Sequence, residues 1–156
     1  MAVLSNAQEA VVIHTAWLYS PYGNNFFKTM RRLGAEKENL DVVADQIGTP
    51  TYAGDLAEAI VAILPQISEK TKGIYHFTNE GFCSWYDFAC KIMEQSGLSC
   101  RINPIPSSAY LSRAKRPLYS VLDKSKIKKT FNIYIRHWEG GLKQCLNQLR
   151  NIKSLS

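Results

Sequence analysis

A few residues in this sequence combine a side chain suited to ligand contact with a position that would present it. Trp17 follows a short apolar run, and ligands of open α/β sheets bind where the strands end. Asn24 and Asn25 precede an amphipathic helix, whose free backbone amides and dipole favour an anion. Arg116 closes a basic stretch, and its planar guanidinium suits bidentate contact with a phosphate. Together these residues predict a site for a phosphorylated ligand.

Each of these residues also has a purely structural explanation. Trp17 would serve equally well in a hydrophobic core, and Asn24 or Asn25 as the N-cap of the helix that follows. A cap and a ligand contact are compatible, because the same free amides serve both. Arg116 would then belong to a solvated basic loop. The residue types alone leave these alternatives open.

No self-sufficient catalytic motif is present in these 156 residues. A glycine-rich Rossmann fingerprint, a Walker loop and a GxSxG motif are absent, and none of the eight tyrosines is followed four residues later by a lysine. The four cysteines show no CxxC spacing, and none lies within a few residues of a histidine. Neither a metal site nor a disulfide framework is therefore predicted.

The charge of the chain is divided unevenly. Residues 1–100 carry 7 Lys and Arg against 11 Asp and Glu, whereas residues 101–156 carry 12 against 2. A basic third suggests an anionic partner, either a phosphorylated small molecule or a nucleic acid. The longest apolar run is far shorter than the ~20 residues of a membrane span. With no basic-then-apolar leader, we expect a cytoplasmic location and no membrane association.

Strand and helix patterns alternate along the chain and predict an α/β fold. The apolar run 10–13 is typical of a parallel strand buried on both faces. The helix after Asn25 is expected to stop at Gly34, and residues 45–51 to form a polar loop. The predicted strands are 10–13, 41–44, 73–78 and 101–106, and the predicted helices lie near 25–33, 56–67, 84–96, 125–129 and 138–152. Ser84 and Asp87 predict a capping box, and Gly97 a helix end.

Six segments, taken in order, resemble the dTDP-4-dehydrorhamnose reductases. The segments are TAWLYS (15–20), GNNF (23–26), DQIGTPTYAGDLA (45–57), GIYHF (73–77), CSWYDFA (83–89) and RPLYSVLD (116–123). The resemblance runs from about residue 2 to residue 149. It implies an extended short-chain dehydrogenase/reductase, in which an N-terminal NAD(P)-binding Rossmann domain is followed by a smaller sugar-nucleotide-binding domain.

The resemblance further implies that this chain is the C-terminal portion of such an enzyme. Residues 1–45 would be a remnant of the doubly wound Rossmann sheet, and residues 46–156 mainly the small α/β substrate-binding subdomain. The family's glycine-rich loop and Tyr-x-x-x-Lys helix lie upstream of the strand matched by 10–13. We therefore expect no catalytic and no cofactor-binding residue here. The implied reaction reduces dTDP-4-dehydro-L-rhamnose to dTDP-L-rhamnose with NADPH or NADH, and neither cofactor is expected on this chain alone.

The expected substrate-binding residues are Trp17 against the sugar, Asn24, Asn25 and Arg116 at the diphosphate, and Gln46 and Thr49 in a wall of the nucleotide pocket. Gln46 and Thr49 lie in a stretch too polar for a core, and simple turn chemistry is their alternative explanation.

Two other functions remain open at this stage. One is a non-catalytic binding or regulatory module built on the same reductase fold. The other is a nucleic-acid binder, which is disfavoured because the basic residues are interleaved with few aromatics and no recognition motif. We expect a dTDP-sugar as partner and no nucleic acid, and a homo-oligomer is left open.

Overall fold

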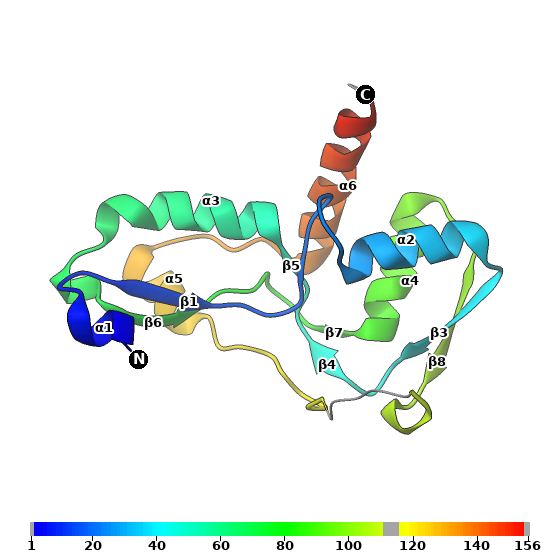
Figure 1. The fold of residues 1–156 in the computed structure, drawn as a ribbon, viewed down its shortest axis with the longest axis horizontal. Coiled ribbons are helices and arrows are strands. Elements are labelled where there is room, and N and C mark those ends of the chain that lie inside the picture. The colour runs from blue at the N-terminus through cyan, green and yellow to red at the C-terminus, as the bar shows by residue number, and fades with distance from the viewer. Residues whose placement is uncertain (1, 111–115, 155–156) are drawn as a thin grey trace.

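A computed structural model describes residues 2–110 and 116–154 of the chain. Figure 1 shows two groups of elements with helix α6 (Trp138–Ser154) between them. In chain order the other elements, with η for 3-10 helices, are α1 (Ala2–Asn6), β1 (Val11–His14), β2 (Leu18–Tyr19), α2 (Phe26–Glu36), β3 (Asn39–Val43), β4 (Ile47–Gly48), β5 (Thr51–Tyr52), α3 (Ala53–Ile63), η1 (Leu64–Gln66), η2 (Glu69–Thr71), β6 (Gly73–His76), β7 (Cys83–Ser84), α4 (Trp85–Ser96), β8 (Arg101–Ile105), η3 (Ser107–Ala109) and α5 (Ser125–Phe131).

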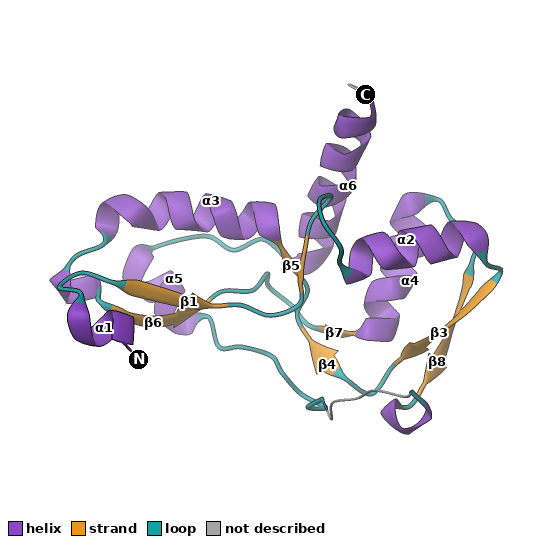
Figure 2. Cartoon of the chain, viewed as in Figure 1, coloured by secondary structure: helices purple, strands orange, loops and turns teal. Residues whose placement is uncertain are grey.

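In the described part of the chain, the strands pair as four two-stranded ladders. Three pairs are parallel: β1 with β6, β2 with β5 and β3 with β8. The fourth pair, β4 with β7, is antiparallel. Helices separate the paired strands along the chain, as parallel pairing requires (Figure 2). The predicted α/β class is thereby confirmed. The register sets His14 opposite His76, so β1 and β6 end side by side.

The first group consists of β1, β6, α3 and α5 around a small hydrophobic cluster. Val11 and Ile13 pack against this cluster, while Val12 lies outside it because successive side chains alternate along a strand. All three side chains are only half-buried. The prediction of a strand buried on both faces is therefore wrong, since the described residues cover the face of Val12 only in part.

The second group joins α2, α4 and α6 to the ladder of β3 and β8. Phe27, Phe88, Ile92, Leu142 and Cys145 are fully buried in its hydrophobic cluster. Apolar residues recur every three or four positions in these helices, so one stripe of each helix is turned inward. The two clusters both draw on residues from either side of residue 45, and the boundary expected there stays a prediction.

The predicted capping signals set the ends of two helices. Asn25 is the N-cap of α2, and its Oδ1 accepts the backbone N–H of Lys28 at 3.1 Å. Ser84 and Asp87 form the capping box of α4, with the Ser84 Oγ accepting the Asp87 N–H at 3.0 Å. Gly97 ends that helix with a φ of 67°, a conformation that favours glycine.

Two local predictions are wrong, both for reasons of packing. Gly34 does not stop α2, which runs on to Glu36; it lies inside the helix, where a Cβ would collide with the Met93 side chain of α4. The stretch 45–51 is not simply a polar loop, because it contains β4 and β5. Thr49 and Thr51 are buried there, since their hydroxyls donate to the backbone oxygens of Gly81 and Ala16.

Candidate functional site

Trp17 lies just beyond the carboxyl end of β1 in an unusual backbone conformation. Its φ is 49°, in the left-handed region that a residue with a Cβ rarely adopts. The buried Thr51 holds this turn, because its N–H donates to the Trp17 carbonyl at 3.1 Å and its hydroxyl to Ala16 at 2.7 Å. Strain of this kind costs about 1–3 kcal/mol and persists only where the surroundings enforce it, which is common at ligand sites.

The indole of Trp17 is stacked on that of Trp85. The ring centroids are 3.5 Å apart and the ring planes differ by 12°. Gly48 of β4 lies against the same indole, because a Cβ on Gly48 would sit 2.5 Å from Cε2 of Trp17. Trp17 and Trp85 are both half-buried. This pair of rings, called the tryptophan stack below, therefore keeps part of its apolar surface open.

Strand β4, whose Gly48 contacts the Trp17 indole, adjoins Gln46 and is bonded to the segment that follows Arg116. Gln46 directly precedes β4, and its side-chain amide donates to the Ser107 hydroxyl at 2.9 Å. On the other side, the Ile47 N–H donates to the Leu118 carbonyl at 2.7 Å. This bond ties the segment that follows Arg116 to β4, and Arg116 itself is exposed. The rest of the basic stretch, residues 113–115, lies outside the described residues.

The start of α2 reaches the tryptophan stack from a third direction. Phe26, its first residue, lies 4.6 Å from Trp85 between ring centroids. The side chain of Asn25 has a structural role. Its Oδ1 caps α2, and its N–H groups donate to the carbonyls of Ser20 and Tyr22. Asn24 is exposed. The structural role predicted for this asparagine pair is thus confirmed for Asn25, and the ligand role of both stays a prediction.

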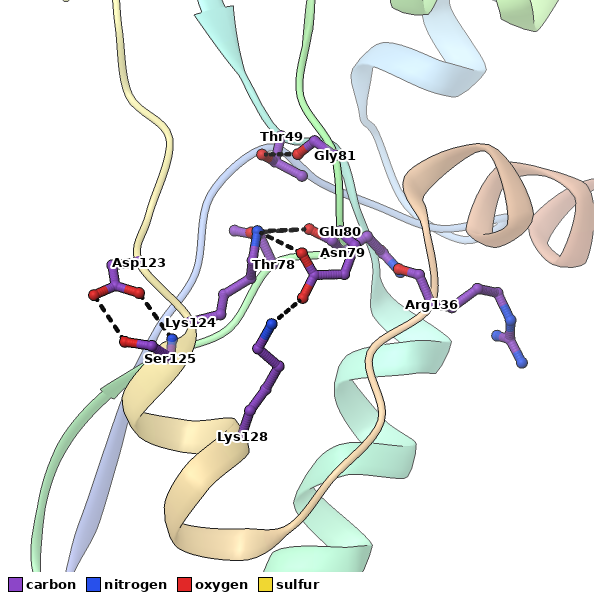
Figure 3. Close-up of polar contacts among 10 residues, drawn as sticks. All are labelled: Thr49, Thr78, Asn79, Glu80, Gly81, Asp123, Lys124, Ser125, Lys128 and Arg136. Atoms are coloured by element: carbon purple, nitrogen blue, oxygen red, sulfur yellow. Dashed lines mark hydrogen bonds and ion pairs between the residues drawn. The ribbon is translucent and has the colours of Figure 1, made fainter.

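Thr49 is the predicted residue whose side chain is least accessible. It is fully buried, and its hydroxyl donates to the Gly81 carbonyl at 2.9 Å (Figure 3). The expectation that it lies in a stretch too polar for a core is wrong, because an internal hydrogen bond allows a hydroxyl to be buried. Its place in a pocket wall stays a prediction.

Sequence reasoning missed a cluster of polar side chains beyond the carboxyl end of β6. We call it the polar junction; its members are Asp55, Asn79, Glu80, Lys124, Lys128 and Arg136. Asn79 is fully buried at its centre. Its Oδ1 accepts the Tyr52 N–H at 2.8 Å, and its Nδ2 donates to a carboxylate oxygen of Asp55 and to the Arg136 carbonyl.

Charged side chains of the polar junction contact one another: Figure 3 shows Lys124 and Lys128 both meeting Glu80, and Arg136 pairs with Asp55. Lys124 is buried; its ammonium group donates to the Asn79 carbonyl at 3.2 Å and lies 3.6 Å from Glu80, which Lys128 contacts at 2.7 Å. Burial alone would raise the pKa of Glu80, but the hydrogen bond from Lys128 and the charge of Lys124 outweigh it and lower the pKa. Burial raises the pKa of Asp55 despite its contacts with Asn79 and Arg136.

In the described part of the chain, no three His, Cys, Asp or Glu residues come together as metal ligands. All four cysteines, Cys83, Cys90, Cys100 and Cys145, are free thiols. Burial raises the pKa of the Cys145 thiol to about 12, as expected of a packing residue. None of the helices described is both long and apolar enough to cross a membrane.

Parallel strand pairs separated along the chain by helices define a protein of the α/β class. A family model described as the RmlD substrate binding domain matches residues 1–151, and the chain belongs to this family. The sequence resemblance to dTDP-4-dehydrorhamnose reductases is thereby confirmed at the level of the family.

Named relatives agree with this assignment. The spore coat polysaccharide biosynthesis protein SpsK of Bacillus subtilis is 42% identical over 141 residues, which cover 90% of this chain and 48% of SpsK. A dTDP-4-dehydrorhamnose reductase structure from Clostridium acetobutylicum matches with a TM-score of 0.83 and 39% identity over 90% of this chain and 49% of that one. The Bacillus anthracis reductase in complex with NADP matches with a TM-score of 0.78 and 38% identity, over 88% and 48%. The chain thus spans about half the length of these relatives.

Proposed function

We propose that this chain binds the dTDP-sugar substrate of a dTDP-4-dehydrorhamnose reductase. The observation that carries the proposal is the family match over nearly the whole chain, together with the meeting of three predicted regions around the tryptophan stack. These regions are the end of β1, the flanks of β4 and the start of α2. A partly exposed aromatic surface, together with an exposed arginine two residues before the segment bonded to β4, suits a ligand with an apolar ring face and a diphosphate.

In this proposal each predicted residue has a chemical role. Trp17 packs against the sugar, and Arg116 pairs with the diphosphate. The N-terminus of α2, opened by Asn24 and Asn25, adds backbone N–H groups and the positive end of a helix dipole. Gln46 is adjacent to β4 and forms part of the nucleotide pocket wall, with Thr49 supporting that wall from its buried position.

The reaction served by this site is reduction of the 4-keto group of dTDP-4-dehydro-L-rhamnose in the cytoplasm. Hydride comes from NADPH, in keeping with the NADP complex of the Bacillus anthracis relative. The residues of this chain bind and orient the sugar so that its C4 faces the hydride, a contribution of proximity. No tyrosine of this chain is followed by a lysine at the fourth position, so we assign the proton donor to no residue here.

Titration calorimetry with dTDP and with a random oligonucleotide tests this function against the nucleic-acid alternative. We expect dTDP to bind with an affinity that falls gently between about 50 and 200 mM salt, because only two phosphates are neutralised. A nucleic-acid binder that contacts six or more phosphates would lose about a thousandfold over that range. Steeply salt-dependent oligonucleotide binding without any response to dTDP would overturn the proposal.

A second assay tests whether this chain binds substrate without binding the cofactor or catalysing the reduction. The chain alone should neither bind NADPH nor reduce the keto sugar, because the cofactor and proton-donor roles are assigned outside it. Turnover by the purified chain would show that catalytic groups are present among these residues after all. A chain that binds dTDP without turnover would fit both the substrate-binding role and a non-catalytic module.

A further inference from the structure

The tryptophan stack joins two residues that are far apart in the sequence, and only one of them has a role so far. Trp17 lies three residues beyond the end of β1, and Trp85 is the first residue of α4. A centroid separation of 3.5 Å with nearly parallel planes is close face-to-face contact along much of both indoles. Aromatic pairs more often adopt offset or edge-to-face arrangements. A stack this close indicates that the surroundings hold both rings in place.

Trp85 is fixed by its own neighbours before it meets Trp17. It directly follows Ser84, the capping residue of α4, whose Oγ and N–H both bond within the capping box. On its side, Phe26 lies 4.6 Å away with its ring tilted by 50°. The backbone of Trp85 is thereby set by the helix start and its ring by an aromatic neighbour. These neighbours restrict both the backbone and the ring of Trp85.

Trp17, by contrast, is held through its backbone, because the buried Thr51 donates its N–H to the Trp17 carbonyl and its hydroxyl to the Ala16 carbonyl. Its φ is in the left-handed region, and it directly precedes Leu18, the first residue of β2. Its ring is confined on one side by Gly48, where even a methyl group would collide. The contact with Trp85 therefore supplies the main surface against which this indole can settle.

Packing in a core would explain Trp85 if its ring were enclosed. The third tryptophan, Trp138, shows what that looks like: it is buried, and its ring meets Phe88 edge-on. Trp17 and Trp85 are half-buried instead and lie only at the margin of the same hydrophobic cluster. Their neighbours include Gly48 of β4, whose Cβ position lies against both Trp17 and Ser120, and Phe26 at the start of α2.

We propose that Trp85 is a positioning residue that holds the indole of Trp17 in the orientation needed to pack on the sugar of the dTDP-sugar. This inference rests on the proposed function, because it takes the sugar contact of Trp17 from there. Trp85 acts through Trp17 and makes no contact with the reacting atoms. Its effect is specific to the sugar, and the nucleotide is bound by other groups.

Far-ultraviolet circular dichroism tests whether the stack exists in solution. Two closely stacked indoles couple their transitions and give a paired positive and negative band. We expect this couplet in the 156-residue chain and in Trp138→Phe, and its loss in both Trp17→Phe and Trp85→Phe. A couplet that survives Trp85→Phe would overturn the proposal, because another pair would then produce it.

Calorimetry then tests the positioning role. The affinity ratio between dTDP-L-rhamnose and dTDP isolates the contribution of the sugar. Trp85→Phe and Trp85→Leu should lower this ratio by about threefold to tenfold, the strength of an aromatic pair, and leave the affinity for dTDP unchanged. In a variant that already carries Trp17→Ala, Trp85→Leu should have no further effect on the ratio, because Trp85 acts only through Trp17.

The outcomes separate the two proposals. If the unaltered chain binds neither ligand, the proposed function fails and the sugar-directed role of Trp85 fails with it. If the unaltered chain binds dTDP-L-rhamnose more tightly than dTDP and Trp85→Phe keeps that ratio, only the positioning role is overturned. Thermal unfolding of each variant identifies misfolding, and Trp85→Phe, as the more conservative change, decides the matter if Trp85→Leu unfolds.

Discussion

The polar junction and the tryptophan stack occupy equivalent places at the ends of two paired strands. Trp17 lies three residues past His14 and Asn79 three residues past His76, and these two histidines are opposite each other in the parallel ladder. In the polar junction, Asn79 is fully buried, and both its amide oxygen and its amide nitrogen have protein partners. In the tryptophan stack, two large rings remain half-exposed.

This difference indicates that the ends of β1 and β6, although adjacent, have different roles. A buried amide whose oxygen and nitrogen both have protein partners, as in Asn79, stabilises the fold. A rigid aromatic surface that is left partly open has already lost its flexibility, so a ligand that covers it pays little further entropy. We therefore assign stability to the end of β6 and binding to the end of β1. The predictions below test whether the two regions can be separated in this way.

Removing Asn79 should have the largest effect, and that effect should be on stability. Asn79→Ala leaves the buried Tyr52 N–H without its partner and takes one hydrogen bond each from Asp55 and from the Arg136 carbonyl, which still accepts the Glu80 N–H at 2.8 Å. We expect the free energy of unfolding to fall by about 3 kcal/mol in urea denaturation. The exposed Asn24→Ala is the matched control and should stay within about 0.5 kcal/mol. Equal effects of the two changes would break the comparison.

Removing Arg116 should do the reverse, with a loss of binding and no loss of stability. Arg116→Ala should weaken dTDP binding by about 1.5–3 kcal/mol, the strength of charge-assisted hydrogen bonds. Arg116→Lys should restore part of this, because the charge is kept and the planar fork is lost. Calorimetry on these variants is compared with Lys129→Ala, a basic residue of α5 that is equally exposed. A similar loss from Lys129→Ala would mean that general positive charge, rather than this arginine, attracts the ligand.

Much of the fold could be predicted from local sequence, because local physics governs it. The capping box of Ser84 and Asp87 and the end of α4 at Gly97 depend on neighbours within four residues, and both are confirmed. Gly34 was misjudged because its reason is tertiary: the side chain of Met93, 59 positions away, needs the space. Helix signals in the sequence cannot distinguish a glycine that ends a helix from one that admits a neighbour.

The same limit applies to the candidate site. The rule that ligands bind at strand ends led to Trp17, and it applies equally to Asn79, which follows another predicted strand. Asn79 was missed because its partners, Asp55 and Arg136, are 24 and 57 residues away and meet it only in the folded chain. The stack of Trp17 on Trp85 was unpredictable for the same reason. Trp85 belongs to the apolar stripe of its helix, a pattern typical of a core residue, and the structure leaves it half-buried.

A methyl group on Gly48 should sharpen the comparison from the binding side. Gly48→Ala places a Cβ 2.5 Å from the Trp17 ring and 2.9 Å from the Ser120 hydroxyl, so the indole must shift. We expect a loss of about 1–2 kcal/mol in stability from overpacking and a weaker tryptophan couplet. Gly140→Ala in α6 is the control for the couplet, because its new methyl would lie 2.9 Å from Cγ and Cδ of Arg136 and near neither indole of the stack. An unchanged couplet in Gly48→Ala would show that Gly48 does not confine Trp17.

The smallest expected effect is the pH dependence contributed by Glu80, and it tests whether the charges of the polar junction stabilise the fold. The contacts with Lys128 and Lys124 lower the pKa of Glu80 in the folded chain, despite its partial burial. Its ion pairs therefore stabilise the fold above the ordinary pKa of a glutamate, and this stabilisation is lost as pH falls through the lowered value. The contribution is below about 1 kcal/mol, because a third of the side chain is exposed and solvent screens the charges. Asp55 acts in the opposite direction, since its pKa is raised and protonation favours the folded chain.

Urea denaturation of the unaltered chain and of Glu80→Gln from pH 7 to pH 3 tests this contribution, and comparing the two cancels the effect of Asp55, which both contain. The free energy of unfolding should fall less with acid in Glu80→Gln than in the unaltered chain, whereas the exposed Glu38→Gln should behave like the unaltered chain. Parallel curves for all three would mean that the hydrogen bonds of Asn79, and not the charges around it, hold the polar junction together.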